Sequence, residues 1–262
     1  MTKRIFSALI LIPIVVYLVL YADIVYLQIA VLFVSLLAFL EWLNMDNTVF
    51  NTTKSIYFVL CSIFIFTALF FSQFSFNILM LIFIIHMISN FSNIHLESVL
   101  KRYFYFGGII YISLYIFIVK LATLENGRLI LMMVVVSIWV GDTFAYIVGK
   151  KFGRMKLAKV ISPHKSYEGA FAGIVFGALS SMIFSFFFIN GLSLTLSLAI
   201  GFIANFVGVF GDLSESVVKR AYNKKDSSSI IPGHGGILDR LDSISFAVFF
   251  IYVLLQWKIL LY

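Results

Sequence analysis

The amino-acid sequence predicts an all-α polytopic membrane protein. Of its 262 residues, 62% are apolar and only 12% are charged, and the mean hydropathy is +1.06. A soluble domain carries about 25% charged residues, so this chain has too few to cover its own surface. Its apolar segments are about 20 residues long and lack the alternation of barrel strands. Helices are then the structure that satisfies the backbone in lipid.

Nine apolar segments are predicted to cross the membrane as helices. They lie near 5–21, 24–44, 56–72, 75–90, 103–120, 128–148, 168–189, 192–211 and 243–261. Lys3 and Arg4 before the first segment resemble the start of a secretory signal. No clear small-residue cleavage pattern follows, so this segment is expected to remain as the first helix.

The positive charges favour one topology. With a cytoplasmic N-terminus, the cytoplasmic segments hold 16 of the 19 Lys and Arg residues, as the positive-inside rule expects. Nine helices then place the C-terminus outside, and the long loops 149–167 and 212–242 share the cytosolic face. The net charge of +7 therefore reflects topology and gives no indication of nucleic-acid binding. Abundant Phe, Ile and Asn are typical of an AT-rich bacterial genome, which suggests that the membrane is a bacterial plasma (inner) membrane.

Charged residues and glycines are concentrated in the second half of the chain. Residues 1–127 are predicted to be an N-terminal transmembrane scaffold, and 128–262 a C-terminal transmembrane catalytic region. Between 128 and 242 lie 12 of the 19 basic residues, seven of the 12 acidic residues and 13 of the 16 glycines. The functional site is therefore expected there, and Glu41, a carboxylate within the second segment, has no explanation at this level.

Asp142 lies inside an otherwise apolar predicted helix. Burial of a carboxylate in lipid is costly, so Asp142 is expected to face a polar cavity and to have a cationic or metal partner. By spacing, Trp139 and Tyr146 share its helix face. The alternative is a carboxylate near a helix end that reaches water.

The segment after this helix contains six basic residues between positions 149 and 165. Positive-inside charge and attraction to anionic headgroups would explain these residues alone. The glycines between them, however, allow a backbone to approach phosphates closely. His164 in this segment is expected to be a loop residue rather than a ligand.

The richest group of polar residues runs from 211 to 242. Asp212 and Glu215 are one helical turn apart, as are Asp239 and Asp242, so two helix ends could present four oxygen ligands to Mg²⁺. The single cysteine, Cys61, and the lack of repeated histidines give no support for zinc. A solvated loop with internal ion pairs is the alternative, and Pro-Gly-His-Gly-Gly could be a flexible turn.

Basic residues in the same segment could neutralise a polyphosphate. They are Lys219, Arg220, Lys225 and Arg240. Metal and bases together provide the positioning and charge stabilisation that phosphoryl or nucleotidyl transfer requires. Neither a Walker-type loop nor a Gly-x-Gly-x-x-Gly after a strand occurs, so a P-loop or dinucleotide-binding domain is not expected.

Residues 216–242 resemble the signature of the phosphatidate cytidylyltransferase (CDP-diacylglycerol synthase) family. The matching positions are Ser216, Lys219, Arg220, Lys225, Asp226, Pro232, His234, Gly235, Gly236, Asp239, Arg240 and Asp242. Upstream, the segments around Asp142-Thr-x-Ala-Tyr146, Gly149-Lys150 and Ile161-Ser162-Pro-x-Lys165 are similar to further motifs of the family.

This resemblance implies the reaction CTP + phosphatidate → CDP-diacylglycerol + pyrophosphate, with Mg²⁺ and a second metal position. It implies Asp212 and Asp239 as first metal ligands, with Asp142 and Asp242 behind them. The residues implied in catalysis are Asp212, Asp239, Lys219, Arg220, Lys225, Asp226, His234 and Arg240. Those implied in substrate or cofactor binding are Asp142, Tyr146, Lys150, Ser162, Lys165, Gly235 and Gly236. The expected partners are CTP, phosphatidic acid and the bilayer, and a homodimer is compatible with the sequence.

Two other functions stay open at this point. A CTP-dependent kinase of a polyprenol or dolichol would release CDP rather than pyrophosphate, and its alcohol acceptor would need a base. A transporter would place its site near the bilayer midplane between repeats, whereas these charges lie toward one face and no repeat is visible.

Overall fold

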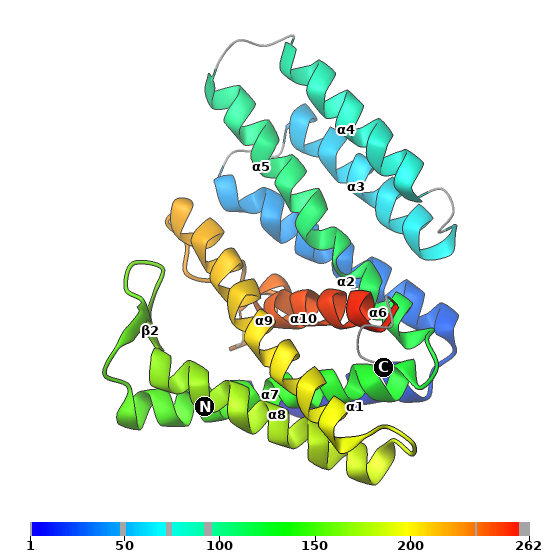
Figure 1. The fold of residues 1–262 in the computed structure, drawn as a ribbon. Helices are drawn as coiled ribbons and strands as arrows, with labels where there is room; N and C mark the ends of the chain where they lie inside the picture. The colour runs from blue at the N-terminus through cyan, green and yellow to red at the C-terminus, as the bar shows by residue number, and fades with distance from the viewer. Residues whose placement is uncertain (1, 48–50, 72–74, 92–95, 234, 257–262) are drawn as a thin grey trace.

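The computed structural model describes residues 2–47, 51–71, 75–91, 96–233 and 235–256, and it is mainly helical (Figure 1). Its helices are α1 Thr2–Leu20, α2 Ile24–Leu43, α3 Thr52–Phe70, α4 Ser75–Phe91, α5 Leu96–Ser113, α6 Ile116–Ala122, α7 Gly127–Phe152, α8 Tyr167–Phe188, α9 Leu194–Ala221 and α10 Leu238–Gln256. A short 3-10 turn, η1 Asn44–Asp46, follows α2.

The predicted class, a multi-pass helical membrane protein, is confirmed. Within the described ranges, six helical stretches are long and apolar enough to cross a membrane. They are Ile24–Asp46, Thr52–Phe70, Val99–Ala122, Gly127–Phe152, Tyr167–Phe188 and Leu194–Ala221. Two further apolar helices, Leu9–Leu20 and Asn77–His86, are shorter. The total of nine spans and the orientation of the termini stay predictions.

The two long loops contain more regular structure than the sequence suggested. Between 149 and 167, α7 continues to Phe152, and β1 (Lys156–Ala158) pairs antiparallel with β2 (Ser162–Ser166). Between 212 and 242, α9 continues to Ala221 and α10 begins at Leu238. The polar residues of both segments are therefore held on helix ends and a hairpin, and only 222–237 lies between helices.

The predicted helix at 103–120 is divided in the structure. Helix α5 ends at Ser113 and α6 begins at Ile116. At the junction, the amide of Leu114 donates to the Tyr111 carbonyl at 3.2 Å, and that of Tyr115 donates to the Ile112 carbonyl at 3.0 Å. These are bonds to the third preceding residue, which tighten the helix locally without ending its path.

The helices form two groups that meet at α2, α9 and α10. Helices α3, α4 and α5 lie on one side of the molecule, and the α7–α8 pair lies on the other (Figure 1). The most extensive contacts join α7 to α8, α8 to α9 and α9 to α10, while α2 packs on α3 and α5. The C-terminal helices therefore form a packed unit of their own, and the hairpin lies at one end of it.

Small residues let α7 and α8 approach closely. They recur every four residues on both helices, at Gly141, Ala145 and Gly149 on α7 and at Gly169, Gly173 and Gly177 on α8. A Cβ atom added to Gly173 would lie 2.9 Å from the Gly141 carbonyl oxygen, and one added to Gly169 would lie 2.7 Å from that of Ala145. Such small-residue faces are typical of helix packing in membranes, where close backbone contact replaces the hydrophobic effect.

A buried polar contact fixes α9 against this pair. The Asn205 side-chain amide donates to Ser137 Oγ at 2.7 Å and to the Gly201 carbonyl at 2.9 Å. Ser137 Oγ in turn donates to the Gly177 carbonyl on α8 at 2.8 Å. One chain of hydrogen bonds thereby joins α7, α8 and α9.

Candidate functional site

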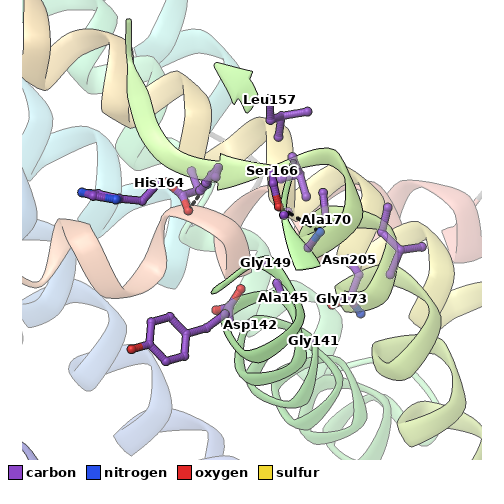
Figure 2. Close-up of a pocket in the computed structure, with 18 of the residues that line it drawn as sticks. Gly141, Asp142, Ala145, Gly149, Leu157, His164, Ser166, Ala170, Gly173 and Asn205 are labelled. Atoms are coloured by element: carbon purple, nitrogen blue, oxygen red, sulfur yellow. Dashed lines mark hydrogen bonds and ion pairs between the residues drawn. The ribbon is translucent and has the colours of Figure 1, made fainter. Parts of the chain in front are cut away.

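A cavity of about 670 Å³ opens between α7, the hairpin, α8 and α9. Its polar lining residues are Asp142, Tyr146, Lys150, Lys156, His164, Lys165, Ser166, Asn205, Asp212 and Ser243. Figure 2 shows Asp142 on α7, His164 on the hairpin strand and Asn205 on a separate helix. The close packing of α7 on α8 lets glycine backbone, rather than bulky side chains, form part of the wall.

Two carboxylates and three lysines line this cavity, namely Asp142, Asp212, Lys150, Lys156 and Lys165. Lys165 Nζ forms an ion pair with Asp212 Oδ2, and Ser216 Oγ donates to Asp212 Oδ1 at 3.2 Å. Asp142 lies in the electrostatic field of Asp212, Lys165 and Arg240. Lys150 Nζ lies 5.7 Å from the centre of the exposed Tyr146 ring. Asp142 thus faces a polar cavity and has a cationic neighbour, as its position in the sequence predicted.

A second, more buried polar network joins α9 to α10. Lys219 Nζ lies 3.0 Å from Glu215 Oε2 and 2.5 Å from Asp239 Oδ1. The other oxygen of Asp239, Oδ2, accepts from the Ser227 amide at 2.9 Å, Ser227 Oγ at 2.9 Å and the Gly236 amide at 2.8 Å. Asp239 is therefore held by four hydrogen bonds from three different parts of the chain.

These contacts set the charge state of Asp239, which lies ahead of the apolar part of α10. Burial raises the pKa of this carboxyl, but hydrogen bonds from Lys219 and from the backbone of Gly236 and Ser227 outweigh burial and lower the pKa below its ordinary value. Asp239 is therefore ionised at neutral pH and acts in this network as an acceptor only.

The segment that precedes α10 is shaped by its glycines. Gly235 has φ +83°, which favours glycine, and its carbonyl accepts from the Ile231 amide at 2.9 Å. A Cβ atom added to Gly236 would lie 2.0 Å from Ser227 Oγ and 2.4 Å from Glu41 Oε2. Glycine is therefore required at Gly235 by its positive φ and at Gly236 by close contacts. His234, predicted to be catalytic, lies outside the described residues.

The remaining predicted residues surround these two groups. Arg220 donates from Nε to the Ile161 carbonyl at 3.1 Å and from a terminal nitrogen to the Lys224 carbonyl at 2.9 Å, so it fixes the hairpin turn. Ser162 lies opposite Ala158 in the hairpin rather than in the cavity lining. Asp242 is buried and accepts from the Ser243 amide at 2.7 Å. Arg220, Lys225, Asp226 and Arg240 are exposed.

Sequence reasoning missed three residues of this region. His164 was expected to be a plain loop residue, yet it lines the cavity. Ser227 is buried between Asp239 and Glu41, and Glu41 reaches this segment from α2. A carboxylate within an apolar segment was the one signal for Glu41, because its cost implies a partner.

The carboxylates of the cavity match the donor preference of Mg²⁺. This ion takes oxygen ligands and is commonly bound by one or two carboxylates together with substrate phosphates and water. Asp142 and Asp212 could provide such ligands, whereas Asp239 already accepts four hydrogen bonds. Within the part of the chain that the structure describes, no group of three or more His, Cys, Asp or Glu could hold a metal by itself. A magnesium ion here would complete its coordination with water or with the phosphate oxygens of a substrate.

Comparison with known proteins identifies the family of this chain. The model of the cytidylyltransferase family matches residues 2–258. The chain belongs to the cytidylyltransferase family. Because the match spans the N-terminal helices as well as the C-terminal unit, both halves are part of the family's common architecture.

Several curated relatives share about two fifths of their residues with this chain in the matched region. A phosphatidate cytidylyltransferase of Haemophilus influenzae is 41% identical over 132 residues, which are 48% of this chain and 46% of that protein. One of Bacillus subtilis is 45% identical over 120 residues, 46% of this chain and 45% of that protein. The chloroplastic phosphatidate cytidylyltransferase 4 of Arabidopsis thaliana is 46% identical over 121 residues, 46% of this chain and 31% of that protein. The chain spans about half the length of the bacterial relatives it matches.

Proposed function

We propose that this protein transfers the cytidylyl group of CTP to phosphatidate, forming CDP-diacylglycerol and pyrophosphate. Membership of the cytidylyltransferase family and the names of its relatives support this assignment. The observation that carries it is the lining of one cavity by Asp142 and Asp212 together with Lys150 and Lys165. A site for transfer between two phosphates needs both cations for the phosphates and carboxylates for a metal.

In the reaction, a phosphate oxygen of phosphatidate attacks the α-phosphorus of CTP. The bond from this phosphorus to the oxygen bridging the β-phosphate breaks, and pyrophosphate leaves with that electron pair. Lys150 and Lys165 hold the phosphates by charge, since an ammonium group gives charge-assisted hydrogen bonds to them. The attacking phosphate monoester is already largely ionised at neutral pH, its second pKa being about 6, so no strong general base is needed.

Magnesium is the cofactor that fits this proposal. When bound, Mg²⁺ would neutralise charge on the triphosphate and so assist departure of pyrophosphate. Asp142 and Asp212 are the residues that would hold it, with Asp242 as a buried neighbour. A second metal position, implied by the family signature, belongs to the same proposal.

The membrane arrangement extends this proposal. We infer nine spans, with the N-terminus and the cavity on the cytosolic side and the C-terminus outside, in the plasma membrane of a bacterium. CTP would then enter from the cytosol and phosphatidate from the inner leaflet. Association into a homodimer is compatible with the exposed apolar helices.

The test is an assay of the purified protein in detergent with radiolabelled CTP, phosphatidic acid and Mg²⁺. Label extractable into lipid, with release of pyrophosphate, is expected. It should nearly disappear in Asp239→Asn and fall less in His234→Ala, because no base is required. CDP released in the presence of a polyprenol, without label from phosphatidate, would instead identify a lipid kinase. If folded protein makes neither CDP-diacylglycerol nor CDP, the transporter hypothesis would remain.

A further inference from the structure

Glu41 lies in α2, in the half of the chain predicted to be scaffold, yet it is only 3% exposed and faces the polar segment before α10. A buried carboxylate is costly unless hydrogen bonds satisfy it. Its neighbours in sequence are apolar, so those bonds must come from elsewhere in the fold. The hydrogen-bond donors to Glu41 show which part of the molecule this side chain holds in place.

Each oxygen of Glu41 accepts two hydrogen bonds. Oε1 accepts from Ser228 Oγ at 2.6 Å and from the Ile237 amide at 2.9 Å. Oε2 accepts from Ser227 Oγ at 2.9 Å and from the Leu238 amide at 2.9 Å. Ser227 Oγ has a single proton, which it shares between Glu41 Oε2 and Asp239 Oδ2. Glu41 is therefore held by three hydrogen bonds of its own and by one that it shares with Asp239.

The four bonds converge on the residues that hold Asp239. Ser227 Oγ lies 2.9 Å from both Glu41 Oε2 and Asp239 Oδ2, and the Leu238 amide belongs to the residue immediately before Asp239. Gly236, whose amide donates to Asp239, has no room for a side chain because Glu41 and Ser227 fill that space. The negative charge of Glu41 also lies at the N-terminus of α10, where the helix dipole favours it.

Other residues of the N-terminal half contact the same segment. Lys224 Nζ donates to the Asn44 carbonyl at 2.6 Å, just beyond the end of α2. Ser7 Oγ of α1 donates to the Pro232 carbonyl at 3.3 Å. The segment 224–238 is thus attached to α1 and α2 at several points, and Glu41 provides the largest number of these bonds.

We propose that Glu41 is a positioning residue, which fixes segment 227–238 and thereby the carboxylate of Asp239 for cytidylyl transfer. It acts through Ser227, Gly236 and the first turn of α10 and touches no reacting atom. Only the predicted effect on kcat rests on the proposed function. The attachment of segment 227–238 to Glu41 can be measured without any substrate.

The kinetic test compares Glu41→Ala, Glu41→Gln and Asp46→Asn in purified protein. Glu41→Ala should lower kcat about 30-fold, within the range of about 10- to 100-fold for lost support of a site residue, and change the KM for CTP less than about threefold. Glu41→Gln keeps one acceptor oxygen but turns its NH2 group toward the amide of Ile237 or Leu238, so it should recover only part of this loss. It also serves if the alanine variant does not fold.

Asp46→Asn is the matched control for loss of a buried carboxylate. Asp46 pairs with Lys54 and accepts from Tyr105, both in the N-terminal half. This variant should lower the melting temperature but keep kcat of the folded protein within about twofold, because these two partners of Asp46 belong to α3 and α5 and not to the segment that holds Asp239. Equal losses of kcat in Asp46→Asn and Glu41→Ala would overturn the proposal and make Glu41 a general stabiliser.

Limited trypsin digestion tests the attachment without substrate. Lys225 is exposed and lies two residues before the segment that Glu41 holds, so cleavage after it should be at least about tenfold faster in Glu41→Ala than in wild type or Asp46→Asn, through local opening. Unchanged cleavage in Glu41→Ala would refute the positioning role. Faster cleavage in a protein whose wild type makes no CDP-diacylglycerol would sustain the attachment and reject only the proposed reaction.

Discussion

Lys219 Nζ lies 2.5 Å from Asp239 Oδ1 and so connects α9 to α10 through a nearly buried ion pair. The same ammonium lies 3.0 Å from Glu215 Oε2. One cation therefore stands against two buried carboxylates. Loss of that cation would leave two buried carboxyl groups without their ion-pair partner, which is strongly destabilising in a protein interior.

Lys219→Met is expected to destabilise the protein by about 3 to 5 kcal/mol, as measured for the loss of one partner of a buried pair, and to abolish cytidylyl transfer. Thermal unfolding in detergent measures the first effect. Lys101→Met is the control, because Lys101 pairs with Glu97 at 2.6 Å on the surface, where water and salt screen the pair, so its loss should change the melting temperature little. Similar melting temperatures for the two variants would contradict a central role for Lys219.

Lys165→Met is expected to raise the KM for CTP by about tenfold or more, since a hydrogen bond to a charged group contributes about 1.5 to 3 kcal/mol. Lys165 lines the cavity beside Asp212, whereas Lys159 lies in the exposed turn of the same hairpin. Lys159→Met should leave the KM unchanged. Equal effects of both substitutions on the KM would mean that the hairpin acts only through its overall charge.

Asp212→Asn is expected to raise the Mg²⁺ concentration for half-maximal activity by at least about tenfold, because Mg²⁺ has few protein ligands to lose. Asp142→Asn should act in the same direction. Asp23→Asn, at the exposed start of α2, provides a control that removes an acid elsewhere. A Mg²⁺ titration of each variant gives the result, and an unshifted curve for Asp212→Asn would remove this residue from the metal site.

Gly141→Ala is expected to destabilise the α7–α8–α9 contact by about 1 to 3 kcal/mol, the usual cost of overpacking. An added Cβ would lie 1.9 Å from Asn205 Oδ1 and 3.0 Å from the Gly173 carbonyl oxygen. Gly107→Ala in α5 meets no atom within 4 Å and should be neutral or stabilising, by up to about 1 kcal/mol, because alanine favours helix. Opposite shifts of the two melting temperatures are therefore expected, and equal shifts would refute close packing at Gly141.

The sequence was sufficient to predict the helical class and the position of Asp142 beside a cavity. Long apolar segments with few charges require helices in lipid, and the cost of burying Asp142 required a polar surrounding, which the cavity provides. Spacing on one helix also placed Asp212 near Glu215, and Asp239 near Asp242. These inferences succeed because they depend on local geometry or on the solvent alone.

Contacts between distant segments could not be predicted in the same way. The partners of Glu41 include the amides of Ile237 and Leu238, and a backbone amide has no sequence signature. The hairpin escaped prediction because its strands are short and polar, and because Glu168 stabilises it through the amides of Arg154 and Met155 at 3.0 Å and 3.1 Å. The charge of Lys219 was evident, but its position between two carboxylates depends on how α9 meets α10.

The contacts of Glu41 also constrain the order in which the protein can mature. Ser227 and Leu238 follow Glu41 in the chain by 186 and 197 residues, so a ribosome makes α2 long before any of its partners for this carboxylate exists. Until α10 arrives, Glu41 must keep access to water or to a proton. The hydrogen bonds of Glu41 can therefore form only late in assembly. A chain that ends before Ser227 would leave this carboxylate without these partners.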